Sequence, residues 1–227
     1  MAQPIQIEVP GSGTVGGSIA RPAGAPRGAL VVIQEIFGVN AHMRDVVDRY
    51  AQEGFVALAP AMFDPVERGV ELGYDGDGFK RGRELLGALG IDRAVAIVDA
   101  ALQLLRGEQL AVGAVGFCWG GTIAYLANTR LGLPAVSYYG ARTVPFLDEP
   151  LRAPMLFHFG ERDESIPAAD IAAHAAKHPD AMLHIYRAGH AFNRDVDPKA
   201  YDADSARLAH RRTIAFFSEA LATGGPP

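Results

Sequence analysis

The chain has 227 residues and a formal net charge of −5, with 49% hydrophobic and 21% charged residues. These values are ordinary for one globular domain with a sizeable core, and the negative charge argues against nucleic acid or an anionic membrane as a partner. No apolar run approaches the roughly 18 residues that a membrane-spanning helix needs, and the N-terminal residues lack the pattern of a signal peptide. We therefore expect a soluble, cytoplasmic protein with no membrane partner.

Short apolar runs alternate with helical patterns along most of the chain. The nearly continuous hydrophobicity of several runs is typical of parallel strands covered on both faces. The predicted strands cover residues 5–9, 14–20, 29–33, 55–59, 111–115, 135–139, 155–159 and 182–186. Helices are predicted over residues 44–52, 122–129, 168–177 and 204–221, with one or two more between 85 and 105, broken near Gly90 and capped by Asp92. This order predicts one α/β domain over residues 1–227, with a doubly wound, mostly parallel sheet of about eight strands and a frayed tail at 224–227.

The most informative motif is Gly116-Phe117-Cys118-Trp119-Gly120, which joins a predicted buried strand to a predicted helix. Strand, Gly-x-nucleophile-x-Gly and helix together form the nucleophile elbow of the α/β-hydrolase fold, here with cysteine where serine is more usual. The glycines are needed because the turn is sharp and strained. At a helix N-terminus, the dipole and free N–H groups favour a thiolate. We therefore interpret Cys118, the single cysteine of the chain, as a nucleophile rather than a small buried apolar residue.

Two later segments supply partners for this nucleophile. Asp163 follows the seventh predicted strand, and His190 follows the eighth. The chain order of nucleophile, acid and histidine is that of α/β-hydrolases, and the carboxyl ends of parallel strands meet at one edge of a sheet. His190 is the predicted base and Asp163 the predicted acid that orients it, with Glu161 and Glu164 as alternatives for the acid.

The other histidines have no comparable context. His174 and His178 are four residues apart on a predicted helix, but no third metal ligand is evident. We predict that both are solvated, and we expect no metal and no organic cofactor.

Five segments of the chain resemble the dienelactone hydrolase (carboxymethylenebutenolidase) family. The segments are Gln34-Glu35-Ile36-Phe37-Gly38-Val39-Asn40, the cysteine elbow, Ser137-Tyr138-Tyr139-Gly140, Gly160-Glu161-Arg162-Asp163 and Gly189-His190-Ala191-Phe192-Asn193-Arg194. Their order is specific for the family and less specific for one substrate, because the family also acts on other small esters and lactones. The resemblance implies a carboxylic ester hydrolase of aromatic degradation, acting on a carboxylated enol-lactone such as dienelactone (4-carboxymethylenebut-2-en-4-olide).

The resemblance also assigns catalytic residues. The family's Cys-His-Asp triad falls on Cys118, His190 and Asp163, its glutamate beside the nucleophile on Glu35, and its substrate-carboxylate arginine on Arg194. Residue chemistry supports these roles, because a glutamate in an apolar segment needs a partner and an arginine can clamp a carboxylate with two hydrogen bonds. The alternatives are a glutamate side chain that reaches solvent and an exposed surface arginine.

The remaining site residues follow from the same resemblance. The backbone N–H groups of Ile36 and Trp119 are expected to form the oxyanion hole, and a second substrate arginine is expected at Arg81 or Arg83. The other expected substrate-binding residues are Phe37 and Tyr138.

Other functions remain open at this stage. Within the family, the alternative is a general small carboxylesterase or thioesterase. From other classes, the alternatives are a redox-sensing thiol protein that uses Cys118 and a binding protein on an inactive hydrolase fold. A small-molecule substrate is the one partner expected, and the chain is expected to be a monomer or a weak oligomer.

Overall fold

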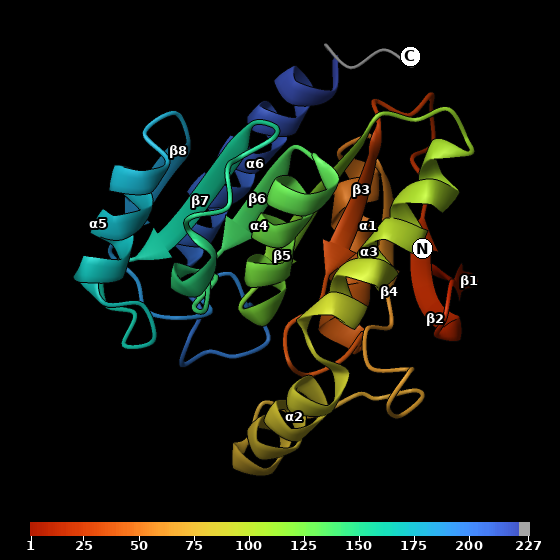
Figure 1. Ribbon diagram of the computed structural model, residues 1–227, viewed down its shortest axis with the longest axis horizontal. Coiled ribbons are helices and arrows are strands. Elements are labelled where there is room, and N and C mark those ends of the chain that lie inside the picture. The colour runs from red at the N-terminus through yellow and green to blue at the C-terminus, as the bar shows by residue number, and fades with distance from the viewer. Residues whose placement is uncertain (223–227) are drawn as a thin grey trace. The chain divides into compact units, whose positions relative to one another are not determined.

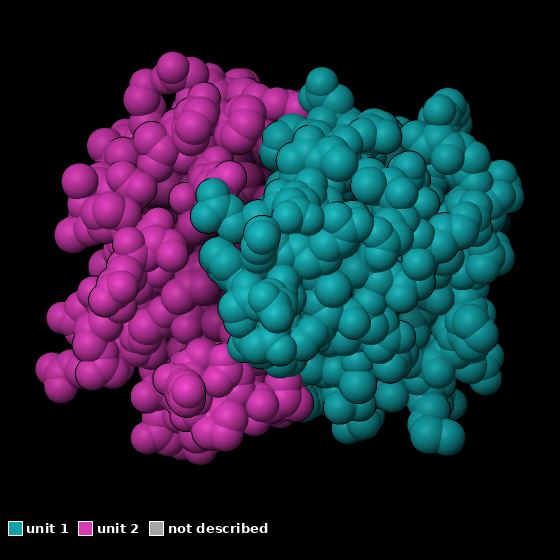
Figure 2. All heavy atoms as spheres, turned by 90° about the horizontal axis from the view of Figure 1, so that it is seen from below, with its two compact units in different colours: residues 1–113, 221–227 teal, residues 114–220 magenta. Residues whose placement is uncertain are grey.

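The computed structural model describes residues 1–222. The chain divides into two compact units, the first of residues 1–113 with the chain from residue 221 and the second of residues 114–220 (Figure 2). The tail predicted at 224–227 lies outside the described residues. The assignment of one domain to the whole chain stays a prediction.

All the predicted strands and helices occur, with small shifts at their ends except at the start of α2 (Gly76–Leu89). The strands are β1 (Gln3–Val9), β2 (Gly13–Ala20), β3 (Ala29–Ile33), β4 (Val56–Pro60), β5 (Val112–Phe117), β6 (Ala135–Tyr138), β7 (Met155–Gly160) and β8 (Met182–Tyr186). The helices are α1 (Ala41–Gln52), α2 (Gly76–Leu89), α3 (Ile91–Arg106), α4 (Trp119–Leu131), α5 (Ala168–Lys177) and α6 (Ala203–Ala222), with a short 3₁₀ helix at Val144–Phe146.

In the first unit, the strands follow the order β1-β2-β4-β3. The β1–β2 and β2–β4 pairs are antiparallel, whereas β3 and β4 are parallel. Every residue of β3 and β4 is buried. Helix α3 crosses in front of these strands in Figure 1 and α1 lies behind them, which explains why β3 and β4 are apolar throughout.

In the second unit, β5, β6, β7 and β8 pair in chain order, and all three pairs are parallel. The first three of these strands are fully buried, whereas β8 at the edge is mostly exposed or half-buried. Their carboxyl ends therefore share one edge, and the segments that follow β5, β7 and β8 lie there.

The helical region predicted between residues 85 and 105 extends further toward the N-terminus, because it starts at residue 76. It contains two helices, and α2 begins at Gly76 because the Asp75 side chain accepts a hydrogen bond from the Gly78 N–H at 2.8 Å. The prediction that Asp92 caps the second helix is wrong. The N-cap of α3 is Gly90, at φ 76°, and Asp92 lies in the first helical turn. A negative charge there interacts favourably with the helix dipole.

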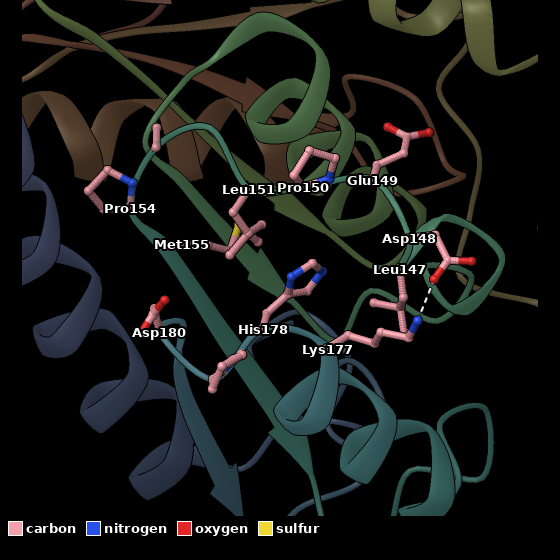
Figure 3. A pocket seen from close by; sticks show the side chains of 12 residues that line it. Leu147, Asp148, Glu149, Pro150, Leu151, Pro154, Met155, Lys177, His178 and Asp180 are labelled. Atoms are coloured by element: carbon pink, nitrogen blue, oxygen red, sulfur yellow. Dashed lines mark hydrogen bonds and ion pairs between the residues drawn. The ribbon is translucent and has the colours of Figure 1, made fainter.

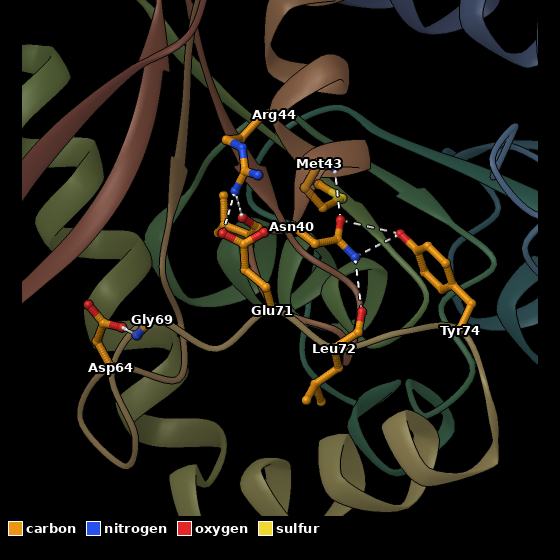
Figure 4. A network of polar contacts seen from close by, with 9 residues as sticks. Asn40, Met43, Arg44, Asp64, Gly69, Glu71, Leu72 and Tyr74 are labelled. Carbon is orange, nitrogen blue, oxygen red and sulfur yellow. Dashed lines mark hydrogen bonds and ion pairs between the residues drawn. The ribbon is translucent and has the colours of Figure 1, made fainter.

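Figure 4 shows a polar network that holds the loop after β4 against the loop after β3 in the first unit. Asn40 caps α1 by accepting from the Met43 N–H at 3.2 Å, and its amide donates to the Tyr74 hydroxyl at 3.0 Å and to the Leu72 carbonyl at 3.4 Å. Nearby, the Leu72 N–H donates to the Phe37 carbonyl at 2.9 Å. The segment from Phe37 to Asn40 is thus held against the loop after β4.

The prediction that His174 and His178 are solvated is wrong, because both are buried. His174 Nδ1 lies 2.6 Å from the Asp170 carbonyl oxygen and its Nε2 contacts the Thr143 hydroxyl at 2.5 Å. His178 Nε2 lies 2.9 Å from the Tyr125 hydroxyl. The two histidines lie on the face of α5 that packs against the sheet. Their i, i+4 spacing therefore indicates a buried helix face rather than a metal site.

The buried histidines make stability fall in mild acid. Burial lowers the pKa of His158, His174, His178 and His184 from 6.5, so below that pH the unfolded chain binds more protons than the folded chain. We expect the free energy of unfolding, measured in urea, to fall from pH 7 to pH 5.5 by up to about 1.4 kcal/mol per pH unit for each of the deeply buried His158 and His174, and by less for the more exposed His178 and His184. His190, whose pKa is raised, opposes part of this fall.

The variant His174→Asn isolates one such group, because an amide can still donate to the Asp170 carbonyl. This variant should show a shallower fall than the parent chain. A slope as steep as that of the parent would contradict the assignment of acid sensitivity to His174.

Candidate active site

The elbow has the local geometry that its sequence predicts. Cys118 lies directly before α4, at φ 54°, and its N–H donates to the Tyr138 carbonyl at 3.0 Å. A Cβ on Gly116 would lie 1.8 Å from the Gly120 carbonyl oxygen, and a Cβ on Gly121 would lie 2.8 Å from the Tyr138 carbonyl oxygen. The chain can make this turn only because these positions lack side chains.

The second unit brings the three predicted catalytic side chains together. His190 Nε2 lies 3.2 Å from Cys118 Sγ, and His190 Nδ1 lies 2.7 Å from Asp163 Oδ2. The other oxygen of Asp163 accepts from the Ser165 N–H at 2.8 Å, and the carboxylate is buried. Because a carboxylate only accepts, Asp163 fixes the proton on Nδ1 and turns Nε2 toward the sulfur.

The flanking acids do not compete for this position. Glu161 and Glu164 are both exposed, whereas Asp163 contacts the His190 ring directly. The geometry therefore selects Asp163 among the three carboxylates that the sequence left open.

The electrostatics favour a charged His190. Burial alone would lower the pKa of His190, but the hydrogen bonds to Asp163 and Cys118 outweigh it and raise this pKa to about 10. An imidazolium beside the sulfur stabilises a thiolate. Once the sulfur is acylated, its negative charge is gone and the pKa of His190 falls, which frees the ring to act as a base.

Residues with a strained backbone lie in and next to the triad. Tyr139 and Ala191 have positive φ values of 42° and 60°, and Cys118 has 54°. The Tyr139 ring lies 5.1 Å from the His190 ring in an edge-on arrangement. Positive φ is unfavourable for residues with a side chain and is typical of functional sites.

A pocket of about 340 Å³ opens beside His190. Its polar lining includes Arg162, Asp197, Lys199 and Tyr201, from the segments after β7 and β8. No motif in the sequence indicates the last three, although the i, i+3 spacing of Arg194 and Asp197 is consistent with an ion pair. This pocket is the candidate site for a small substrate, because His190 is among its lining residues.

A larger pocket, of about 580 Å³, lies elsewhere in the same unit. Figure 3 shows its lining, which includes Pro154, Met155 and His178. Met155 begins β7, whereas Asp163 follows the other end of that strand. The larger pocket is therefore at the amino end of the strand and is not the site of the triad.

Three other predicted site residues lie in the second unit. Arg194 is buried, and its Nη1 donates to Asp197 Oδ2 at 3.2 Å, so it is not the exposed arginine of the alternative interpretation. Trp119 is the buried first residue of α4. Tyr138 is buried, with its hydroxyl 2.6 Å from Thr213 Oγ1 and its ring 4.8 Å from that of Phe117.

The remaining predicted site residues lie in the first unit. Glu35 is 1% exposed, which excludes the alternative in which its side chain reaches solvent. Ile36 and Phe37 are also buried, and the Phe37 ring meets Tyr74 edge-on at 4.7 Å.

The two candidates for a second substrate arginine are both exposed on α2. Arg81 pairs with Glu84 at 2.9 Å and also with Glu67. Arg83 lies over the Phe79 ring, 5.9 Å from its centroid. Arg81 already has two carboxylate partners, whereas Arg83 pairs with no carboxylate among residues 1–222.

No helix within residues 1–222 is long and apolar enough to cross a membrane. Within the same residues, no group of three or more His, Cys, Asp or Glu side chains is arranged to hold a metal ion.

The comparisons with known proteins agree on one family. Residues 15–221 match the model of the Dienelactone hydrolase family. Carboxymethylenebutenolidase of Pseudomonas putida is 31% identical, covering 96% of this chain and 97% of its own, and that of Pseudomonas sp. (strain P51) is 30% identical, covering 94% of each. A solved structure from Klebsiella pneumoniae subsp. pneumoniae, provisionally named a dienelactone hydrolase, superposes with a TM-score of 0.84 at 28% identity, covering 96% of this chain and 99% of that one. This likeness confirms the predicted fold class, and the chain belongs to the dienelactone hydrolase family as one of its hydrolases.

Proposed function

We propose that the protein hydrolyses a small carboxylated enol-lactone or ester through a thioester on Cys118. The observation that carries the proposal is the continuous chain of contacts from Asp163 through His190 to Cys118, at 2.7 Å and 3.2 Å. A redox-sensing thiol would need a reactive sulfur, but it would not need a histidine whose second nitrogen is held by a buried carboxylate.

In the first step, the Cys118 thiolate attacks the carbonyl carbon while His190 holds the proton. Backbone N–H groups of Ile36 and Trp119, assigned from the family, would hold the oxyanion, and each such donor typically contributes about 3 kcal/mol to the transition state. The carbon–oxygen bond then breaks and the leaving oxygen departs as an enolate. An enolate is a weak base, so it leaves in preference to the thiolate, whereas a simple alkoxide would not.

In the second step, water cleaves the thioester. His190 first gives the proton that it held in the first step to the released enolate or to solvent, because acylation lowers the pKa of His190. The neutral ring then takes a proton from the attacking water, the carbonyl carbon–sulfur bond breaks, and the proton on the imidazolium balances the charge of the released thiolate. The fall in the pKa of His190 after acylation makes this step possible.

Two charged residues support the proposal that the substrate carries a carboxylate. Arg194 is a buried cation close in sequence to His190, and a substrate carboxylate would compete with Asp197 for it. Glu35 is assigned from the family as the carboxylate beside the nucleophile, and its burial at 1% exposed supports a role that requires a dry site.

Removal of the arginine tests the substrate preference. Arg194→Ala should lower kcat/KM for a carboxylated ester by roughly one and a half to three and a half decades, because losing one side of a desolvated charge pair costs about 2–5 kcal/mol. The methyl ester of the same acid never forms that pair and should lose much less. The measurement is kcat/KM on this matched pair of substrates.

Asp197→Asn is the matched control, because it breaks the ion pair and keeps the arginine. If Arg194 acts only through its pair with Asp197, both variants will lose activity equally on both substrates. That outcome would make the arginine structural and would leave a general small carboxylesterase or thioesterase as the function.

A further inference from the structure

A buried polar cluster lies next to the triad in the second unit. It consists of Tyr138, His158, Tyr186 and Thr213, from β6, β7, β8 and α6, and is here called the His158 cluster. His158 Nδ1 lies 2.8 Å from the Tyr186 hydroxyl and its Nε2 lies 3.0 Å from Thr213 Oγ1. His158 and Thr213 are completely buried. The mechanism uses no side chain of His158, Tyr186 or Thr213.

One arginine sets the direction of these hydrogen bonds. Arg212 Nη1 donates to the Tyr186 hydroxyl at 3.1 Å, and a guanidinium can only donate. The Tyr186 hydroxyl therefore accepts from Arg212, and its own proton is satisfied when it is donated to His158 Nδ1. In that arrangement, His158 carries its proton on Nε2 and donates to Thr213.

The His158 side chain stays uncharged near pH 7. Burial, together with the nearby charges of His184 and Arg212, holds the pKa of His158 well below 6.5. A proton added to Nδ1 would also meet a Tyr186 hydroxyl that already accepts from Arg212. The cluster is therefore a fixed support rather than a pH switch.

Two of the strand ends that the cluster joins, those of β6 and β8, also contact a catalytic segment. The Tyr138 carbonyl accepts from the Cys118 N–H at 3.0 Å. The Tyr186 ring packs 5.1 Å from Phe192, two residues after His190. The Phe192 ring lies 5.3 Å from that of Tyr139, which in turn faces His190.

We propose that His158, Tyr186 and Thr213 are positioning residues that hold the carboxyl ends of β6, β7 and β8 in the register at which His190 meets Cys118. The proposal rests on the proposed function for its meaning in catalysis. The proposal also predicts that these residues maintain the contact between Cys118 and His190, and this contact can be probed without any substrate.

The test is Tyr186→Phe, which removes the hydroxyl and keeps the ring against Phe192. The readout is the rate of alkylation of Cys118 by iodoacetamide from pH 4 to pH 10, which follows the thiolate at the single cysteine. A loosened His190 stabilises the thiolate less, so the half-maximal pH should rise by at least about one unit, which is a tenfold loss in the thiolate equilibrium. The value of kcat/KM on a p-nitrophenyl ester should fall roughly tenfold or more.

Tyr125→Phe is the matched control. Tyr125 is a second buried tyrosine in the same unit whose hydroxyl contacts a buried histidine, His178, at 2.9 Å, and His178 lines the pocket at the amino end of β7. We expect a comparable fall in melting temperature in this variant, with an unchanged alkylation profile and kcat/KM within twofold of the parent. A second pair keeps the test independent of folding, because Thr213→Val should reproduce Tyr186→Phe, whereas Thr213→Ser, which keeps the hydroxyl, should restore the parent profile.

An unchanged alkylation profile in both Tyr186→Phe and Thr213→Val would overturn the proposal. An equal shift in Tyr125→Phe would overturn it as well, because the effect would then follow general destabilisation. Failure of the proposed function has a different signature, in which the parent chain forms no acyl-enzyme with an ester while its alkylation profile remains measurable.

Discussion

Cys118→Ala is expected to abolish ester hydrolysis and to leave the fold intact. Alanine keeps a Cβ at the same place, so it tolerates the φ of 54° as cysteine does, and it removes only the sulfur that contacts His190 at 3.2 Å. Loss of the nucleophile in a triad typically costs about 10⁴-fold in kcat or more. The measurement is kcat on a p-nitrophenyl ester, with circular dichroism and melting temperature for the fold.

Cys118→Ser is the matched variant, with an oxygen in place of the sulfur. It should retain only weak activity, because a hydroxyl ionises far less readily than a thiol in a site arranged for a thiolate. Activity close to that of the parent in the alanine variant, in a preparation shown to lack other esterases, would remove Cys118 from the mechanism.

Asp163→Asn should lower kcat by about 10²–10⁴-fold, because an amide at this position can donate to Nδ1 and so favours the wrong tautomer of His190. Substrate affinity should change little, since the loss concerns the orientation of the base. The loss of the carboxylate should also lower the pKa of His190 from about 10, which an NMR titration of the ring can follow. In the parent chain, Asp163 accepts from His190 at 2.7 Å and from the Ser165 N–H at 2.8 Å.

Two neighbouring carboxylates supply the control. Glu161→Gln and Glu164→Gln change the same charge by the same chemistry, but both side chains are exposed. We expect kcat within a factor of about two in both, as for surface substitutions away from the site. A nearly silent Asp163→Asn beside an inactive Glu161→Gln or Glu164→Gln would show that the acid has been misassigned.

Much of the fold could be predicted because its signals are local. The all-apolar run Ala29–Ile33 is predicted and observed with the same bounds, and the elbow glycines are explained by contacts that a Cβ would make. The triad followed from chain order, since β5, β7 and β8 are parallel neighbours or near neighbours and their following segments share one edge.

The features that the sequence did not indicate are non-local. The burial of His174 depends on contacts with Thr143 and with the rings of Phe157 and Phe159, which are distant in sequence. The choice of Asp163 over Glu161 depends on which side chain turns inward after β7. No spacing rule identifies His158, because its partners come from β8 and α6.

The thioester on Cys118 can be tested by acid-quenched mass spectrometry of the protein during turnover of a p-nitrophenyl ester. At times matching the burst of p-nitrophenol, we expect one acyl group per chain, located on the peptide that contains Cys118 and labile to hydroxylamine as a thioester is. Steady turnover with no acyl group on Cys118, or with the acyl group on another residue, would contradict the account.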